Sequence, residues 1–121
     1  MSGTKYILVI DRDKLVCRII KLFLENTGKY RVTYSTDIAK GIKSRMSKRI
    51  ELILFDDRFP QFDGLHLSDH VRSNMKRPVP LLPTGAVIDR SRLKMPHIDL
   101  NTIINGTILK RIDELVKSLH D

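Results

Sequence analysis

The feature that most constrains this chain is a regular alternation between short apolar runs and longer segments with helical spacing. Lys5–Ile10 and Leu52–Phe55 are continuous apolar, strand-like runs, each followed directly by an aspartate. Runs of this kind are typical of strands that are covered on both faces, as in a parallel sheet. Three further strands are predicted over residues 30–34, 81–82 and 102–104.

Between these strands, apolar residues recur at helical spacing. The first helix begins near Lys14, and Gly28 supplies its stop. The predicted helices carry these residues: Leu15, Ile19, Leu22 and Phe23; Ile38, Ile42 and Met46; Leu67, Val71 and Met75; a short segment from Asp89 to Met95; and Ile108, Ile112, Leu115, Val116 and Leu119. Strands and helices alternate about five times, which predicts an α/β fold with a parallel sheet covered by helices on both faces. The 121 residues fit one domain, spanning 1–121.

Composition narrows the function classes. Cys17 is the only cysteine, and no apolar run is long enough to cross a bilayer, so we expect a cytoplasmic chain without a membrane partner. The net charge of +8 favours acidic partners. A nucleic-acid partner is disfavoured, because the chain has no tryptophan and only 6% aromatic residues that could stack on bases.

Polar side chains follow three of the predicted strands. Asp11 ends the first, Asp56 ends the third, and Thr84 comes just after the fourth. In open parallel sheets, ligands bind outside the carboxyl ends of the strands. We therefore expect these three residues to gather in one acidic site.

The residues that carry this pattern are Ile7–Asp11, Leu54–Asp56 with Pro60 and Asp63-Gly64, and Leu82–Gly85. Over essentially the whole chain, they resemble the receiver domains of two-component response regulators. The resemblance implies a three-layer, flavodoxin-like sandwich with five parallel strands in the order 2-1-3-4-5. It also implies a phosphorelay function without enzyme activity of its own, in which Asp56 accepts a phosphoryl group and the hydroxyl of Thr84 contacts it. The implied partner is a histidine kinase or phosphotransfer protein.

The resemblance further implies a Mg²⁺ site with Asp11, Asp56 and the backbone carbonyl of Arg58 as ligands. The second acid of the family is Arg12 here, and a guanidinium cannot coordinate a metal. Asp13 follows, but it would need a local backbone change to substitute. We therefore expect Mg²⁺ binding to be weak or absent.

A second departure concerns the lysine that the family carries after its fifth strand. The preferred alignment places Asn105-Gly106 there, whereas an alternative alignment uses Lys94-Met95-Pro96 and deletes most of the preceding helix. The preferred alignment leaves the last helix at a normal length.

Arg12 leads to two hypotheses. In the first, its guanidinium takes the metal position and pairs with Asp11 and Asp56, which locks the site and leaves a phosphorylation-independent pseudo-receiver that works as a binding module. In the second, Arg12 points outward, Asp11 and Asp13 hold a weak metal, and slow phosphorylation persists. A basic nucleic-acid-associated α/β protein with structural carboxylates is the rival from another class.

The sequence also suggests a partner surface. In the family, the face of the fourth helix, fifth strand and fifth helix commonly carries dimer or partner contacts, so an acidic protein or a second copy of the chain is expected here. The candidate residues are Arg90, Arg92, Lys94, Lys110 and Arg111.

Overall fold

The computed structural model describes residues 3–44, 49–58, 61–62, 65–66, 69, 79–94, 96–97 and 99–118. Its central sheet has the order β2-β1-β3-β6, and every pairing in it is parallel. The strands are β1 (Lys5–Ile10), β2 (Tyr30–Ser35), β3 (Ile50–Phe55) and β6 (Leu81–Pro83). The helices are α1 (Lys14–Glu25), α2 (Ile38–Ser44), α4 (Leu100–Ile103) and α5 (Ile108–Ser118). The predicted α/β fold class is confirmed, as are the first four strands in their expected order.

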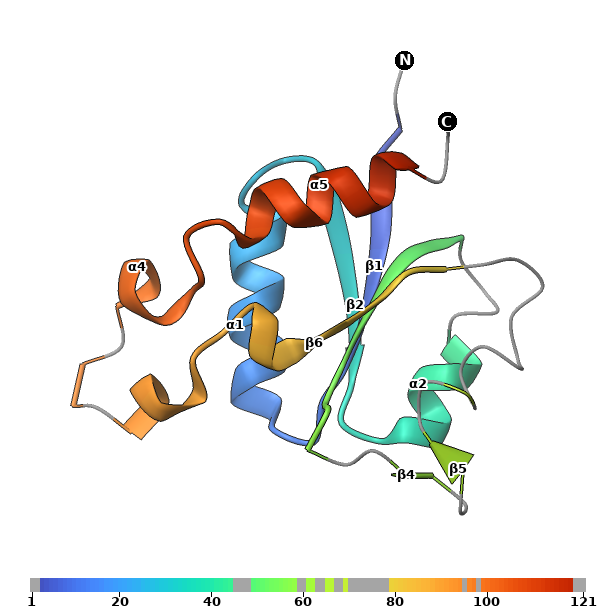
Figure 1. Ribbon diagram of the computed structural model, residues 1–121, viewed down its shortest axis with the longest axis horizontal. Coiled ribbons are helices and arrows are strands. Elements are labelled where there is room, and N and C mark those ends of the chain that lie inside the picture. The colour runs from blue at the N-terminus through green and yellow to red at the C-terminus, as the bar shows by residue number, and fades with distance from the viewer. Residues whose placement is uncertain are drawn as a thin grey trace.

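Alternate side chains of β1 supply two separate apolar clusters, one on each face of the sheet. Ile7 and Val9 pack with buried residues of α1 and α5, whereas Leu8 and Ile10 pack with Ile38 of α2. Figure 1 shows the resulting three layers, with α1 and α5 on one side of the sheet and α2 on the other. A slip of β1 by one residue would exchange the side chains of the two clusters and shift Asp11 relative to the edge of the sheet, so the register determines where its carboxyl end lies.

The ends of α1 follow from local sequence. The Asp13 side chain accepts a hydrogen bond from the Leu15 N–H, as an N-cap does, at 2.9 Å. At the other end, Gly28 has a φ of 79°, a conformation that favours glycine, and the predicted stop is confirmed. The helix therefore returns the chain to β2 within a few residues.

The expected fifth strand over residues 102–104 is not a strand. Asp99 caps a short helix instead, accepting a hydrogen bond from the Asn101 N–H at 2.9 Å, and α4 runs to Ile103. Ile104 then forms an isolated antiparallel bridge with Ile88. The run of β-branched residues favoured a strand, but the cap at Asp99 and the burial of Ile103 and Ile104 in the core determine the observed turn.

Two 3-10 segments lie between β6 and α4: η2 (Thr84–Ala86) and η3 (Arg90–Lys94). The second falls within the short helix expected from Asp89 to Met95. A two-stranded antiparallel pair, β4 (Gln61–Phe62) with β5 (Leu65–His66), follows β3. The expected helix with Leu67, Val71 and Met75 lies outside the described residues, as do Pro60 and Gly64.

In the part of the chain that is described, no helix has the length and apolar character needed to span a membrane.

Candidate functional site

Three strand ends bring Asp11, Asp56 and Thr84 together, as the sequence predicts. All three are buried, with exposed fractions of 1%, 3% and 0%. The hydroxyl of Thr84 donates to Asp11 Oδ2 at 2.8 Å. The Asp56 N–H continues the sheet pairing, donating to the Ile10 carbonyl at 2.8 Å. The carboxylates thus lie at the carboxyl edge of the sheet, where parallel α/β folds bind ligands.

Asp11 is held from two sides by the start of α1. Its Oδ1 accepts the Asp13 N–H at 2.8 Å, and its backbone carbonyl accepts a hydrogen bond from Cys17 Sγ at 3.4 Å. Burial and the neighbouring Asp11 charge raise the pKa of the Cys17 thiol to about 12. This cysteine is therefore a structural, unreactive thiol that fixes α1 against the end of β1.

Arg58 forms a bidentate ion pair with Asp56. Nε of Arg58 donates to Asp56 Oδ1 and Nη2 donates to Oδ2, both at 2.9 Å, and the Arg58 backbone N–H adds a bond to Oδ1 at 3.1 Å. Burial by itself raises the pKa of Asp56, but the hydrogen bonds from Arg58 and the positive charges of Arg90 and Arg58 together lower it below its usual value. Asp56 is therefore a carboxylate at neutral pH.

A second arginine, Arg90, enters the same site from η3. Its Nη2 donates to Asp11 Oδ2 and, at 2.6 Å, to the hydroxyl oxygen of Thr84, while Asp56 Oδ1 lies 3.6 Å from it. Only 19% of the Arg90 side chain is exposed. The prediction that Arg90 is an exposed partner-binding residue is wrong, because its guanidinium points inward and pairs with Asp11.

Of the two hypotheses for Arg12, the one in which its guanidinium pairs with Asp11 and Asp56 is wrong. Arg12 is exposed, and its contact with Asp56 runs through its backbone N–H, which lies 3.4 Å from Oδ2. The guanidinium groups on the acids belong instead to Arg58 and Arg90. Their sequence positions, two residues after Asp56 and six after Thr84, follow no periodic pattern, because neither residue lies on a strand or an α-helix.

The remaining candidates lie outside the acid pair. Asp13 uses its carboxylate to cap α1. Asn105 is exposed; its amide donates to the Ala86 carbonyl at 3.2 Å and its side-chain oxygen accepts the Thr107 N–H at 3.1 Å. It therefore shapes the turn before α5 rather than contacting the acids. The other expected partner residues are all exposed: Arg92, Lys94, Lys110 and Arg111.

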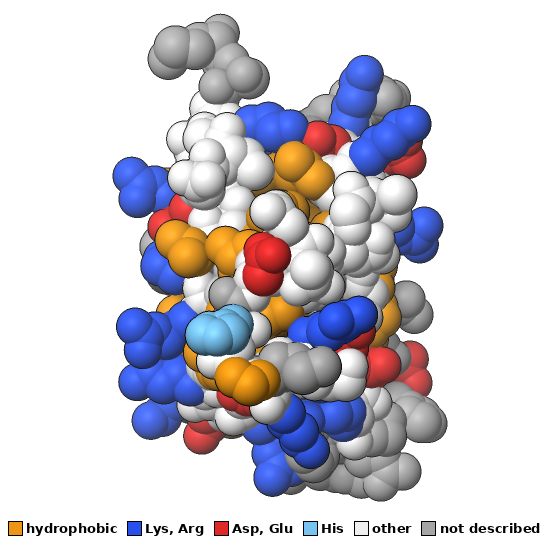
Figure 2. All heavy atoms as spheres, turned by 90° about the vertical axis from the view of Figure 1, so that its left-hand side faces the viewer, with side chains coloured by type: hydrophobic (Ala, Val, Ile, Leu, Met, Phe, Trp, Pro, Cys, Tyr) orange, Lys and Arg blue, Asp and Glu red, His pale blue; other side chains and the backbone are white. Residues whose placement is uncertain are grey.

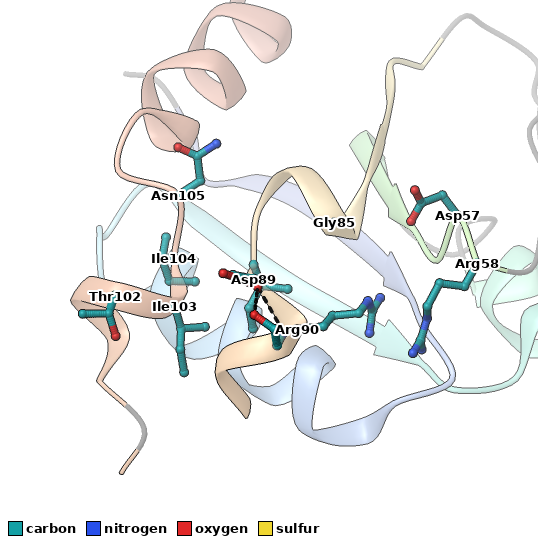
Figure 3. A pocket seen from close by; sticks show the side chains of 11 residues that line it. Asp57, Arg58, Gly85, Asp89, Arg90, Thr102, Ile103, Ile104 and Asn105 are labelled. Carbon is teal, nitrogen blue, oxygen red and sulfur yellow. Dashed lines mark hydrogen bonds between the residues drawn. The ribbon is translucent and has the colours of Figure 1, made fainter. Parts of the chain in front are cut away.

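The site opens into a hollow of about 520 Å³ beside Arg58 and Arg90. Its far wall is formed by residues 102–105, at the place where the fifth strand was expected. Figure 3 shows the side chains of Arg58 and Arg90 reaching toward each other from opposite sides of this hollow, with Asn105 at a distance.

The chain matches a known protein family over most of its length. The model for the response regulator receiver domain matches residues 7–119. The chain belongs to this family. Receiver domains are in general signalling modules that interact with histidine kinases or phosphotransfer proteins, and they typically bind Mg²⁺ at the acidic pocket.

Two curated relatives are longer proteins. The chain is 30% identical over 73 residues to the response regulator ArlR of Staphylococcus saprophyticus, covering 60% of this chain and 33% of the relative. It is 24% identical over 119 residues to protein-glutamate methylesterase/protein-glutamine glutaminase 3 of Rhodospirillum rubrum, covering 95% of this chain and 32% of the relative. The chain thus spans about a third of the length of either.

Solved structures support the fold. A Francisella response regulator receiver domain superposes with a TM-score of 0.65 at 21% identity, over 96% of this chain and 99% of that one. A response regulator from Thermotoga maritima gives a TM-score of 0.63 at 16% identity, over 95% and 99% of the two chains.

The residues present do not fit the metal ion that the family implies. Each of the four carboxylate oxygens of Asp11 and Asp56 accepts a hydrogen bond from a protein donor. Within the described residues, no group of three or more His, Cys, Asp or Glu side chains is arranged to hold a metal. The guanidinium groups of Arg58 and Arg90 lie against these carboxylates, so a Mg²⁺ ion would meet two like charges at the place where it would bind.

The role of Asp13 can be tested by two substitutions. Because asparagine caps a helix as well as aspartate does, we expect Asp13→Ala to lower the free energy of unfolding by about 1 kcal/mol and Asp13→Asn by only a few tenths. Urea denaturation measures both. Equal losses would indicate that the charge of Asp13, rather than its cap, is what matters.

The ion pair on Asp56 predicts a specific acid sensitivity. Its pKa is lower in the folded chain than in the unfolded chain, so its charged form stabilises the fold above about pH 4, and this contribution is lost as the pH falls through the folded pKa. We expect the free energy of unfolding to fall less between about pH 6 and about pH 3 in Asp56→Asn than in the wild type. Asp57→Asn, at an exposed neighbour, should keep the wild-type dependence. An unchanged dependence in Asp56→Asn would contradict the assignment.

Proposed function

We propose that this receiver domain takes a phosphoryl group onto Asp56 and passes the signal on through protein contacts. The observation that carries the proposal is the convergence of Asp11, Asp56 and Thr84 at three strand ends, where all three are buried and Thr84 donates a hydrogen bond to Asp11. The pKa of Asp56 is lowered, so its carboxylate is deprotonated and competent as a nucleophile. The Thr84 hydroxyl lies beside it, between Asp11 and Arg90.

In this proposal the cation comes from the chain itself. The family resemblance assigns the positive charge to a lysine and to Mg²⁺, but the preferred alignment places Asn105 at the lysine position, and the Asn105 amide donates to the Ala86 carbonyl. Arg58 and Arg90 supply the charge at Asp56. Mg²⁺ binding is correspondingly weak, for a different reason from the one the sequence suggested.

The proposed partners follow from charge and family. The phosphodonor is a histidine kinase or phosphotransfer protein in the cytoplasm. An acidic protein, or a second copy of the chain, would contact the exposed basic residues that remain after Arg90 is removed from the set: Arg92, Lys94, Lys110 and Arg111. Figure 2 shows lysine and arginine side chains along the margins of the molecular face that it displays. A surface of this kind accelerates association with an acidic partner at low salt.

A second candidate function is a binding module that works without phosphorylation. The observation in its favour is the paired contact of Arg58 with both oxygens of Asp56, which engages the nucleophile. Because 46% of the Arg58 side chain is exposed, solvent competes for this pair, and we rank the phosphoacceptor first.

Incubation with phosphoramidate, followed by intact-mass measurement, distinguishes the two. We expect the wild type to gain the mass of one HPO₃ unit, Asp56→Asn to gain none, and Asp57→Asn, the adjacent carboxylate, to behave as the wild type. A wild type that gains no mass while remaining folded would support the binding module. An adduct that persists in Asp56→Asn would place the acceptor elsewhere.

A further inference from the structure

Arg58 and Arg90 each lie close to both buried carboxylates. Arg58 pairs with Asp56 at 2.9 Å and lies 3.6 Å from Asp11 Oδ1. Arg90 pairs with Asp11 and lies 3.6 Å from Asp56 Oδ1. The two guanidinium groups therefore bridge the acids, which is the relation a shared cation would have to them.

The formal charges balance without any added ion. Asp11 and Asp56 bring two negative charges, and Arg58 and Arg90 bring two positive ones, the same charge as one Mg²⁺. Arginine stays protonated in proteins, so this compensation does not depend on pH near neutrality. A metal ion entering the site would have to displace donors from the carboxylate oxygens and would meet two like-charged groups.

The two arginines also differ in how firmly they are held. Arg90 is mostly buried and is anchored by both Asp11 and the hydroxyl of Thr84. Arg58 has a half-exposed side chain but a backbone N–H that points at Asp56 Oδ1 at 3.1 Å. Arg90 is thus the more buried of the two guanidinium groups, and Arg58 is the one that pairs with both oxygens of Asp56.

We propose that Arg58 and Arg90 form a metal-free receptor for the phosphoryl group on Asp56. This inference rests on the proposed function of Asp56. A guanidinium presents N–H donors in a planar fork that matches two phosphoryl oxygens, and charge-assisted bonds of this kind are stronger than neutral ones. The phosphoryl group replaces the single charge of Asp56 by up to two, which increases the attraction of both arginines.

The chemical step balances with the donor alone. An oxygen of the Asp56 carboxylate forms a bond to phosphorus as the P–N bond of phosphoramidate breaks. The nitrogen keeps the bonding pair and, being already protonated in the zwitterionic donor, leaves as ammonia. In this step the donors of Arg58 pass from the carboxylate oxygens to the phosphoryl oxygens, while Arg90 stays paired with Asp11 and adds its positive charge beside the group on Asp56.

The test is phosphoramidate labelling of the full chain in EDTA and in MgCl₂, followed by intact mass. We expect wild-type rates in the two conditions to agree within about twofold, and Arg58→Gln and Arg90→Gln each to lower the EDTA rate by at least about tenfold. Arg18→Gln is the matched control, because Arg18 is exposed on α1 and lines a different hollow, beside Leu15 and Leu22. It should label as the wild type.

The outcomes separate this inference from the proposed function. Labelling that requires MgCl₂ would overturn the metal-free receptor and leave Asp56 as the phosphoacceptor. No labelling in either condition would overturn both. Wild-type rates in Arg58→Gln and Arg90→Gln would also overturn the receptor. Circular dichroism checks folding, and the EDTA comparison on the wild type needs no variant, so a poorly folded Arg90→Gln leaves the test intact.

Discussion

Two buried carboxylates at the edge of one sheet are the constraint on which the rest of the structure depends. Placing Asp11 and Asp56 side by side, nearly free of solvent, would be strongly unfavourable without compensating positive charge. Arg58 and Arg90 provide that charge, one from the loop after β3 and the other from η3. The same ion pairs hold those two segments against the sheet. Neutralising the buried acids and positioning the surrounding loops therefore depend on the same contacts.

The fold and the location of the site were readable from the sequence because they depend on short-range patterns. A strand buried on both faces is continuously apolar, and Lys5–Ile10 and Leu52–Phe55 end where polar residues begin. Parallel pairing then aligns the strand ends, so Asp11, Asp56 and Thr84 had to meet. The two separate core clusters, one on each face of the sheet, follow from the same alternation.

The neutralising residues were not readable, because a long arginine side chain reaches its partner through space and leaves no periodic pattern. One of the two sequence-based hypotheses places the guanidinium of Arg12 in the acid site, but Arg12 is exposed, and the guanidinium of Arg90, predicted on a partner surface, lies there instead. The expected fifth strand was wrong for a related reason: a single cap at Asp99 outweighed the strand preference of residues 102–104. In such segments a few specific hydrogen bonds decide between helix and strand. Residue propensities, which are averages over many proteins, do not include those bonds.

The most direct test of the central claim is a MgCl₂ titration of ¹⁵N-labelled protein, followed by NMR. The resonances to follow are the Nε–Hε group of Arg58 and the backbone amides of Arg12, Asp13 and Arg58, all of which donate to the two carboxylates. If the arginines neutralise the acids, these resonances stay in place through the millimolar range of Mg²⁺. Saturable shifts of the same resonances would show that a metal ion enters the site and displaces the arginines, and would contradict the account.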